Sequence, residues 1–196
     1  SDANETAVPW RVAVETRDRP VPLVLPRQAV PTLDRARFAA AEGLRGGAYI
    51  LADAPNGKPD LILIGTGSEI SLIVAGCKTL AEKGVYVRSV SIPSWELFDA
   101  QPRDYRDSLL PPSVRARLAV EAGATQGWCK YVGGEGDVIG VDRFGASAPG
   151  EVVMREYGFT VENVCKGAME LVNRKRSGVH QTTVDEAVQV WRNEGD

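Results

Sequence analysis

Arg27 is the first residue of this chain whose type and position suggest ligand binding. It follows the short apolar run Val21–Leu25 and Pro26, and that run predicts a buried strand. Because α/β proteins bind ligands at the carboxyl ends of their strands, the guanidinium of Arg27 could hold a phosphate or a carboxylate through two parallel hydrogen bonds. The alternative is a solvated surface arginine.

A second candidate lies after the four apolar residues Leu61–Ile64, which predict a strand buried on both faces. Gly65–Gly67 predicts a tight turn, and Ser68 is expected to be the N-cap of the next helix. A dinucleotide fingerprint would need a third glycine where Ile70 stands, so a structural turn is the preferred interpretation. A small anion could still bind beside Ser68 at the helix N-terminus.

A third group of polar residues follows the predicted strand Val138–Val141. Asp142 and Arg143 are neighbours there, and Glu151 lies a few residues further on. Acid–base chemistry from these three side chains is one interpretation. An ion pair of Asp142 with Arg143, within the chain or at a subunit interface, is preferred because such pairs mostly organise loops.

The cysteines give no metal or redox motif. Cys77, Cys129 and Cys165 are odd in number and widely spaced, and we expect buried or half-buried reduced thiols of a cytoplasmic protein. A nucleophilic cysteine would need a histidine beside it, and the one histidine, His180, lies in a polar tail. With one histidine and no ligand spacing, no metal site is predicted.

Composition excludes several partner classes. The formal net charge of −3 argues against nucleic acid, and no apolar segment approaches the ~20 residues of a membrane span. The first ten residues, SDANETAVPW, lack the pattern of a signal peptide, so a cytoplasmic location is expected. Trp95, Trp128 and Tyr131 stand near glycines and indicate an interface or a loop packed on a sheet.

The elements that position these residues alternate between strand and helix. A helix is expected over Asn4–Thr16 with Asn4 as its N-cap, and a short helix from about Ala36. The turn Ala54–Gly57 predicts a hairpin-like return into the second of five strands. The five strands are expected at Ala48–Ala52, Leu61–Ile64, Val85–Ile92, Arg117–Val120 and Val138–Val141. The predicted fold is a three-layer α/β sandwich whose five-stranded sheet is mostly parallel with one antiparallel edge strand.

Five long motifs, in order, resemble the C-terminal part of a transketolase. They are PRQAVPTL, LILIGTGSEISL, PSWELFDAQ, AVEAGATQGWCKYVG and IGVDRFGASAPGEVVMREYGFTVENV. The resemblance covers about Asp2 to Leu171. It implies that residues 1–28 are a remnant of the pyrimidine-binding domain, 29–46 a linker and 47–172 the C-terminal domain. Residues 173–196 match nothing in the family and form a tail with a predicted helix at Thr183–Glu194.

The resemblance also implies an activity. Transketolases are homodimers that move a two-carbon ketol unit from a ketose phosphate to an aldose phosphate in the pentose phosphate pathway, using thiamine diphosphate and a divalent metal (Mg²⁺ or Ca²⁺). The family's cofactor, metal and catalytic residues belong to segments that this chain lacks, so the chain alone is expected to bind no cofactor and to be inactive. Arg27 matches the arginine that holds the substrate phosphate, although the motif reads PRQ here where the family usually has SRQ.

Several functions remain compatible with the sequence. The chain could be a fragment or a split subunit of a transketolase, or part of a dihydroxyacetone synthase on the same scaffold. It could instead be a free-standing regulatory module that binds an anion at Arg27 or Ser68, or a dimerisation domain. The partial pyrimidine-binding domain argues against a module that evolved to stand alone.

Overall fold

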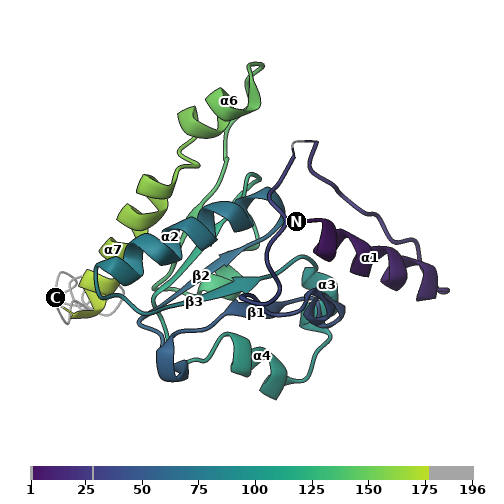
Figure 1. Cartoon of the computed structure of the whole chain (residues 1–196), viewed down its shortest axis with the longest axis horizontal. Helices are drawn as coiled ribbons and strands as arrows, with labels where there is room; N and C mark the ends of the chain where they lie inside the picture. Colours follow the sequence, from purple (N-terminus) through teal and green to yellow (C-terminus); the bar gives the residue numbers. More distant parts are fainter. Residues whose placement is uncertain (1, 28, 177–196) are drawn as a thin grey trace, which may run out of the picture.

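A five-stranded sheet with strand order β1-β3-β2-β4-β5 forms the centre of the molecule (Figure 1). It belongs to a computed structural model that describes residues 2–27 and 29–176. The strands are β1 (Tyr49–Ala52), β2 (Leu61–Gly65), β3 (Val87–Ser91), β4 (Arg117–Val120) and β5 (Asp137–Ile139). All neighbours are parallel except β1 and β3, so the predicted fold class is confirmed.

The predicted strand–turn–helix–strand unit is present as β2, α2 (Ile70–Glu82) and β3. Every residue of β2 is buried, because its side chains alternate between two apolar cores. Leu61 and Leu63 face the core on the α2 side, whereas Ile62 and Ile64 face the core on the opposite side. A strand that is apolar at every position therefore specifies the middle of the sheet.

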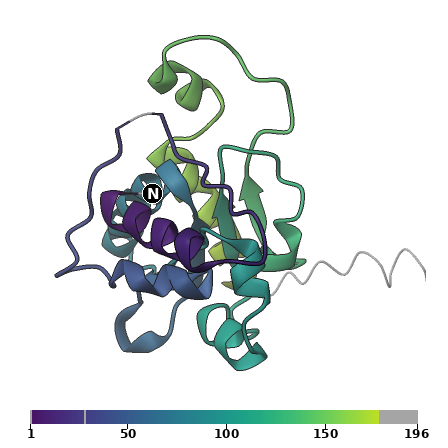
Figure 2. The ribbon, with the colours of Figure 1, turned by 90° about the vertical axis from the view of Figure 1, so that its right-hand side faces the viewer.

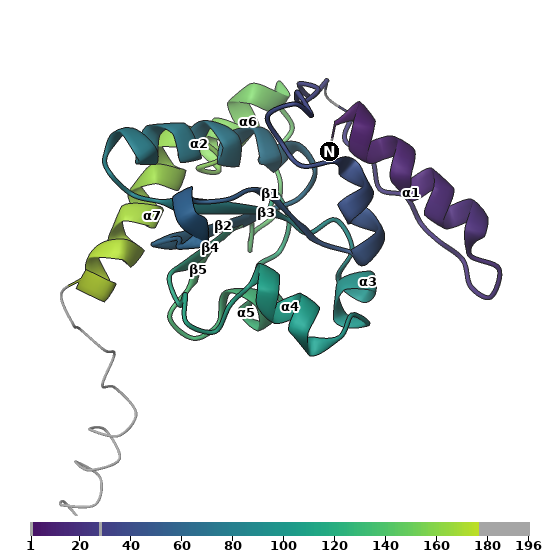
Figure 3. The same ribbon diagram turned by 60° about the horizontal axis from the view of Figure 1, so that its bottom comes forward.

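Helices cover both faces of the sheet, which gives the three layers visible in Figure 3. Helices α2 and α7 (Val161–Arg176) pack together on one face. On the other face lie α3 (Trp95–Asp99), α4 (Arg103–Leu109) and α5 (Cys129–Val132). None of the helices among the described residues has the length and apolar character that a membrane crossing requires.

The predicted hairpin after β1 is wrong. Residues Pro55–Gly57 form a single 3₁₀ turn, and β1 pairs antiparallel with β3 instead of β2. Tyr49 lies opposite Ser91 in this register. The local turn signal was correct, but the edge of the sheet open to β1 is the one beyond β3, because β2 is already flanked by β3 and β4.

The N-terminal segment departs from the predictions in two places. Helix α1 (Ala3–Glu15) begins one residue earlier than expected, because the carboxylate of Asp2, not Asn4, accepts a hydrogen bond from the Glu5 amide at 2.9 Å. The predicted strand Val21–Leu25 does not form. Val24 is 94% exposed, and Pro20, Pro22 and Pro26 have no N–H to give to a partner strand.

The elements just before β1 are short, and α6 (Gly150–Glu156) is peripheral. The helix expected from about Ala36 is instead a turn followed by the 3₁₀ helix η1 (Ala41–Gly46), which lies beside α1 (Figure 2). Helix α6 and the loop before it stand away from the sheet. Helix α7 continues through residues 173–176, and the helix predicted at Thr183–Glu194 lies outside the described residues.

Candidate functional site

Arg27 lies at a bend in the irregular segment between α1 and η1, and it is exposed. The expected strand before it is absent, so Arg27 is not at the carboxyl end of a sheet strand in this structure. None of the ion pairs between described residues uses its guanidinium. The side chain is therefore available to an external anion, and the phosphate-binding role of Arg27 stays a prediction.

Ser68 is not the N-cap of α2. Residues Gly67–Glu69 form the 3₁₀ turn η3 ahead of α2, and the Ser68 hydroxyl donates a 2.7 Å hydrogen bond to the Glu69 carboxylate. Glu69 itself is only 3% exposed. An anion at Ser68 would therefore meet a buried carboxylate, which disfavours the predicted anion site on electrostatic grounds.

The glycine turn at this point has a structural role. A Cβ on Gly65 would lie 2.3 Å from the Cδ1 atom of Ile73 in α2. The glycine thus lets the first turns of α2 pack closely against β2. This contact supports the structural interpretation of the turn over a dinucleotide site.

Asp142 and Arg143 do not form the predicted ion pair. The Asp142 carboxylate accepts hydrogen bonds from the amide and the hydroxyl of Thr125 at 2.9 and 2.7 Å, and these bonds lower its pKa. Arg143 lies 4.2 Å from the centre of the Tyr157 ring and donates to the carbonyl of Glu156. Asp142 binds the loop at Thr125, whereas Arg143 binds the C-terminal end of α6. Glu151 is exposed on α6, so the three side chains do not form one acid–base site.

The aromatic residues after β3 and β4 form one cluster on the sheet. Trp95 and Trp128 meet edge to face with centroids 5.1 Å apart, and Tyr131 lies 5.2 Å from Trp95. Trp128 is 2% exposed. These aromatic residues therefore pack on one face of the sheet from α3 and α5 instead of from loops, and the alternative of an interface stays a prediction.

The three cysteines are free thiols. Burial raises the pKa of Cys77 to about 12 and also raises the pKa of Cys165. Neither Cys77 nor Cys165 is an activated nucleophile, because the raised pKa keeps each thiol protonated. Cys129 is exposed, which corrects the expectation that all three are at least half-buried.

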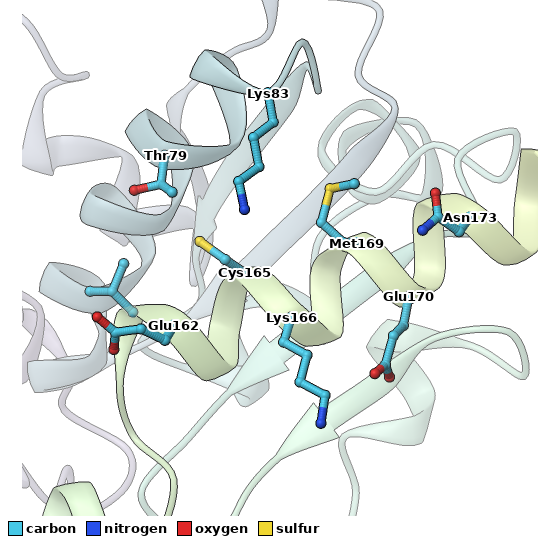
Figure 4. Close-up of a pocket in the computed structure, with 9 residues that line it drawn as sticks. Thr79, Lys83, Glu162, Cys165, Lys166, Met169, Glu170 and Asn173 are labelled. Carbon is cyan, nitrogen blue, oxygen red and sulfur yellow. The ribbon is translucent and has the colours of Figure 1, made fainter.

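A cavity of about 450 Å³ lies between α2 and α7 (Figure 4). Lys83 of α2 and the side chains of Cys165 and Met169 of α7 point into the space between the helices, whereas Lys166 and Glu170 point away from α2. Its charged residues are two lysines and two glutamates, Lys83, Lys166, Glu162 and Glu170. With balanced charges and no activated group, this cavity shows no preference for one class of ligand.

A second cavity, of about 350 Å³, lies at the carboxyl edge of the sheet. Thr66 follows β2, the segment 92–96 follows β3, and Glu121 follows β4, and all of them line it. Glu121 directly follows the predicted strand Arg117–Val120, but the sequence analysis did not bring these three loops together. The available signal was the parallel order of the strands, because their carboxyl ends must share one edge.

Burial raises the pKa of Glu121 to about 7, and the nearby charge of Glu69 adds to this shift. The second carboxylate of the cavity, Glu96, is exposed and accepts a hydrogen bond from the Ser94 hydroxyl at 3.1 Å. Among the described residues that line the cavity, none is a lysine, an arginine or a histidine. The cavity is therefore acidic, with the indoles of Trp95 and Trp128 in its wall.

The described residues 2–27 and 29–176 contain no group of three or more side chains that could hold a metal ion. These residues therefore provide no ready-made set of three protein ligands for the divalent metal that the resemblance to transketolases implies.

Comparison with known proteins identifies the family. Residues 47–160 match the model of the transketolase-like C-terminal domain. The chain is 52% identical over 174 residues to the transketolase of Geobacillus stearothermophilus, an alignment that covers 89% of this chain and 26% of that protein.

Solved structures agree. The transketolase from Leishmania mexicana superposes with a TM-score of 0.81 at 40% identity, covering 89% of this chain and 24% of that one. The transketolase of Pichia stipitis in complex with sedoheptulose-7-phosphate gives a TM-score of 0.81 at 34% identity, covering 90% of this chain and 25% of that one. The chain thus spans about a quarter of the length of these relatives. Because the family model covers more than half of its residues, the chain belongs to the transketolase-like C-terminal domain family.

Proposed function

We propose that this chain is the C-terminal part of a transketolase that transfers a two-carbon ketol unit from a ketose phosphate to an aldose phosphate. The observation that carries the proposal is the 52% identity to the Geobacillus stearothermophilus transketolase across 89% of the chain. The Pichia stipitis relative was solved with a sugar phosphate, sedoheptulose-7-phosphate, which supports sugar phosphates as the substrate class.

In this proposal thiamine diphosphate and a divalent metal (Mg²⁺ or Ca²⁺) bind to parts of the enzyme outside this chain, and the cofactor supplies the carbanion chemistry when bound. The described residues offer no metal ligand set of their own. Their role is to bind the substrate phosphate, to pack against the other domains and to contribute to a homodimer in the cytoplasm. Trp10 at 57% and Leu25 at 48% exposure provide apolar surface for that packing.

Arg27 is the residue that we assign to substrate binding. Its guanidinium is exposed and takes no part in the ion pairs of the described residues, so a phosphate would not have to displace a carboxylate. A charge-assisted bond of this kind is worth about 2 kcal/mol, which corresponds to roughly thirty-fold in kcat/KM. A bidentate contact would make lysine a poor replacement.

The test is kinetic and uses the complete enzyme. Arg27→Ala is expected to lower kcat/KM for phosphorylated sugars about thirty-fold, while non-phosphorylated acceptors lose little. Arg17→Ala is the matched control, because Arg17 is another exposed arginine of the same N-terminal segment. Equal losses for phosphorylated and non-phosphorylated substrates would show that Arg27 does not bind the phosphate.

A further inference from the structure

The acidic cavity at the carboxyl edge of the sheet lies where the chain reverses direction across the sheet. After β2 the chain turns to α2 on one face, and after β4 it turns to α5 on the other. β2 and β4 are adjacent and parallel. Two such strands leave a crevice between their loops, and this is the position at which open α/β sheets bind ligands. Thr66 and Glu121 stand on its two sides.

The lining of this crevice defines the charge of what it can hold. Glu121 and Glu96 contribute carboxylates, and Thr66 and Ser94 contribute hydroxyls. The lining residues that the structure describes include no cationic side chain. Glu69, buried to 3% exposure beside Ser68, adds a further negative charge near Glu121. An anion would be repelled, whereas a cation would relieve the repulsion between Glu69 and Glu121.

The aromatic wall indicates the shape of that cation. Trp95 is half-buried and lines the cavity, and Trp128 holds it edge to face at 5.1 Å. A fixed indole favours a cation with an apolar stem. The ammonium or guanidinium group of such a cation can lie over the face of the ring, and its stem can pack against the apolar surface of the indole. A hydrated metal ion would use neither property of the wall.

We propose that the crevice lined by Thr66, Trp95 and Glu121 is a binding site for a small organic cation that carries an ammonium or guanidinium group. Glu121 is the main anionic partner, and Trp95 contacts the stem. Arg27 is not among the residues that line this crevice. The same cationic group could belong to a free amine or to a lysine or arginine side chain from another part of a longer protein.

The experiment follows the indole N–H resonances of the ¹⁵N-labelled 196-residue chain at pH 8, with the Trp95 resonance assigned through Trp95→Phe. The probe is n-butylammonium, and butyrate is the anion of matched length. We expect a saturable shift of the Trp95 resonance with a dissociation constant of about 1 mM or lower for n-butylammonium, and no saturable shift for butyrate.

Two variants connect the shift to the crevice. Glu121→Gln, which keeps the shape of the side chain, is expected to weaken binding at least about ten-fold, the loss of one charge-assisted hydrogen bond. Glu82→Gln is the control, because Glu82 is exposed at the end of α2 and does not line the cavity. Gly123→Ala gives an independent variant, since its Cβ would lie 3.4 Å from the Glu121 carboxylate and narrow the cavity.

The outcomes separate clearly. A linear response to n-butylammonium, an equal response to butyrate, or unchanged affinity in both Glu121→Gln and Gly123→Ala would overturn the proposal.

Repeating the titration on a longer protein that contains this chain distinguishes the two sources of the cationic group, a free amine and a side chain of the same protein. Retained binding identifies a free ligand. Loss of binding there, with a lower unfolding temperature for Glu121→Gln than for Glu82→Gln, identifies a side chain of the same protein as the cation.

Discussion

The hydroxyl of Tyr49 in β1 donates a hydrogen bond to the buried carboxylate of Glu5 in α1. Ser91 of β3 donates to the same carboxylate oxygen at 2.9 Å, and Arg35 donates to the Tyr49 hydroxyl at 3.1 Å. Glu5 is 1% exposed and Tyr49 is 5% exposed. A buried polar network therefore joins the N-terminal helix to the edge of the sheet, where its hydrogen bonds are protected from water.

Tyr49→Phe tests the strength of this connection. The substitution keeps the ring but removes one donor to Glu5 and one acceptor for Arg35, and we expect the free energy of unfolding to fall by about 1–3 kcal/mol. Urea denaturation measures the change. Tyr86→Phe is the matched control, because the Tyr86 side chain is 51% exposed, and it is expected to change stability by less than about 0.5 kcal/mol. Equal effects of both substitutions would show that the network adds no stability.

A second buried connection joins the loop after β1 to β3. The Arg88 side chain is 8% exposed and donates two 2.8 Å hydrogen bonds to the Asp53 carboxylate. It also donates to the carbonyls of Ser108 and Leu109. Asp53→Asn leaves the buried guanidinium without its counter-charge, and because Asp53 is partly exposed we expect a loss of about 2 kcal/mol.

The control for Asp53→Asn is Glu135→Gln, which breaks an exposed ion pair with Arg115. Exposed pairs contribute about 0–1 kcal/mol, so this variant should unfold at nearly the wild-type urea concentration. If raising the salt concentration weakens the wild-type protein as much as Asp53→Asn does, the Arg88 pair behaves as a surface pair and the prediction fails.

Glu121 makes stability depend on pH. Its pKa is about 7 in the folded protein, above the ordinary value of 4.5, because of burial and the charge of Glu69. Because the pKa of Glu121 is raised on folding, Glu121 contributes to the free energy of unfolding below pH 4.5. This contribution is lost as the pH rises through about 7. Glu121→Gln cannot ionise, so its gain in stability over wild type should be larger at pH 8 than at pH 5.

Urea denaturation of both proteins at pH 5 and pH 8 measures this difference. Glu82→Gln, an exposed substitution of the same kind, should follow the wild-type pH dependence. A wild-type and a Glu121→Gln protein that lose stability in parallel between the two pH values would contradict the prediction.

Gly47 is a position where the backbone permits only glycine. Its φ angle is +81°, and a Cβ would lie 2.1 Å from the amide nitrogen of Phe98. Gly47→Ala is expected to cost about 3 kcal/mol or more, since it combines backbone strain with a clash against the backbone of α3. Gly84→Ala, with a φ of +72° but open space around it, should cost only about 1 kcal/mol. The difference in unfolding midpoints separates the clash from the strain.

The sequence predicted best those elements whose signals are local. The apolar run Leu61–Ile64, the glycine turn and the following helical pattern correctly specified β2, α2 and β3. The partner of β1 was missed, because strand pairing depends on which sheet edge is open, and a turn signal does not report that. Val21–Leu25 was wrong for a related reason, since an apolar run becomes a strand only beside a partner.

The candidate sites were less predictable than the fold. Asp142 and Arg143 are adjacent in sequence, but their side chains contact different residues. Asp142 binds Thr125, and Arg143 lies over the ring of Tyr157. The crevice around Glu121 collects residues from three loops that are far apart in the chain. These loops come together because of the order of the strands in the sheet, and no short sequence motif encodes that order.

The prolines of the N-terminal segment have a consequence for self-association. Val24 and Leu25 are exposed apolar residues in a segment without regular secondary structure, and an exposed apolar segment of this kind can pair with other chains. Pro20, Pro22 and Pro26 interrupt the row of N–H donors that such pairing would require. The side chains of this segment can therefore pack against another surface, whereas its backbone lacks the N–H donors that a growing β-aggregate would need.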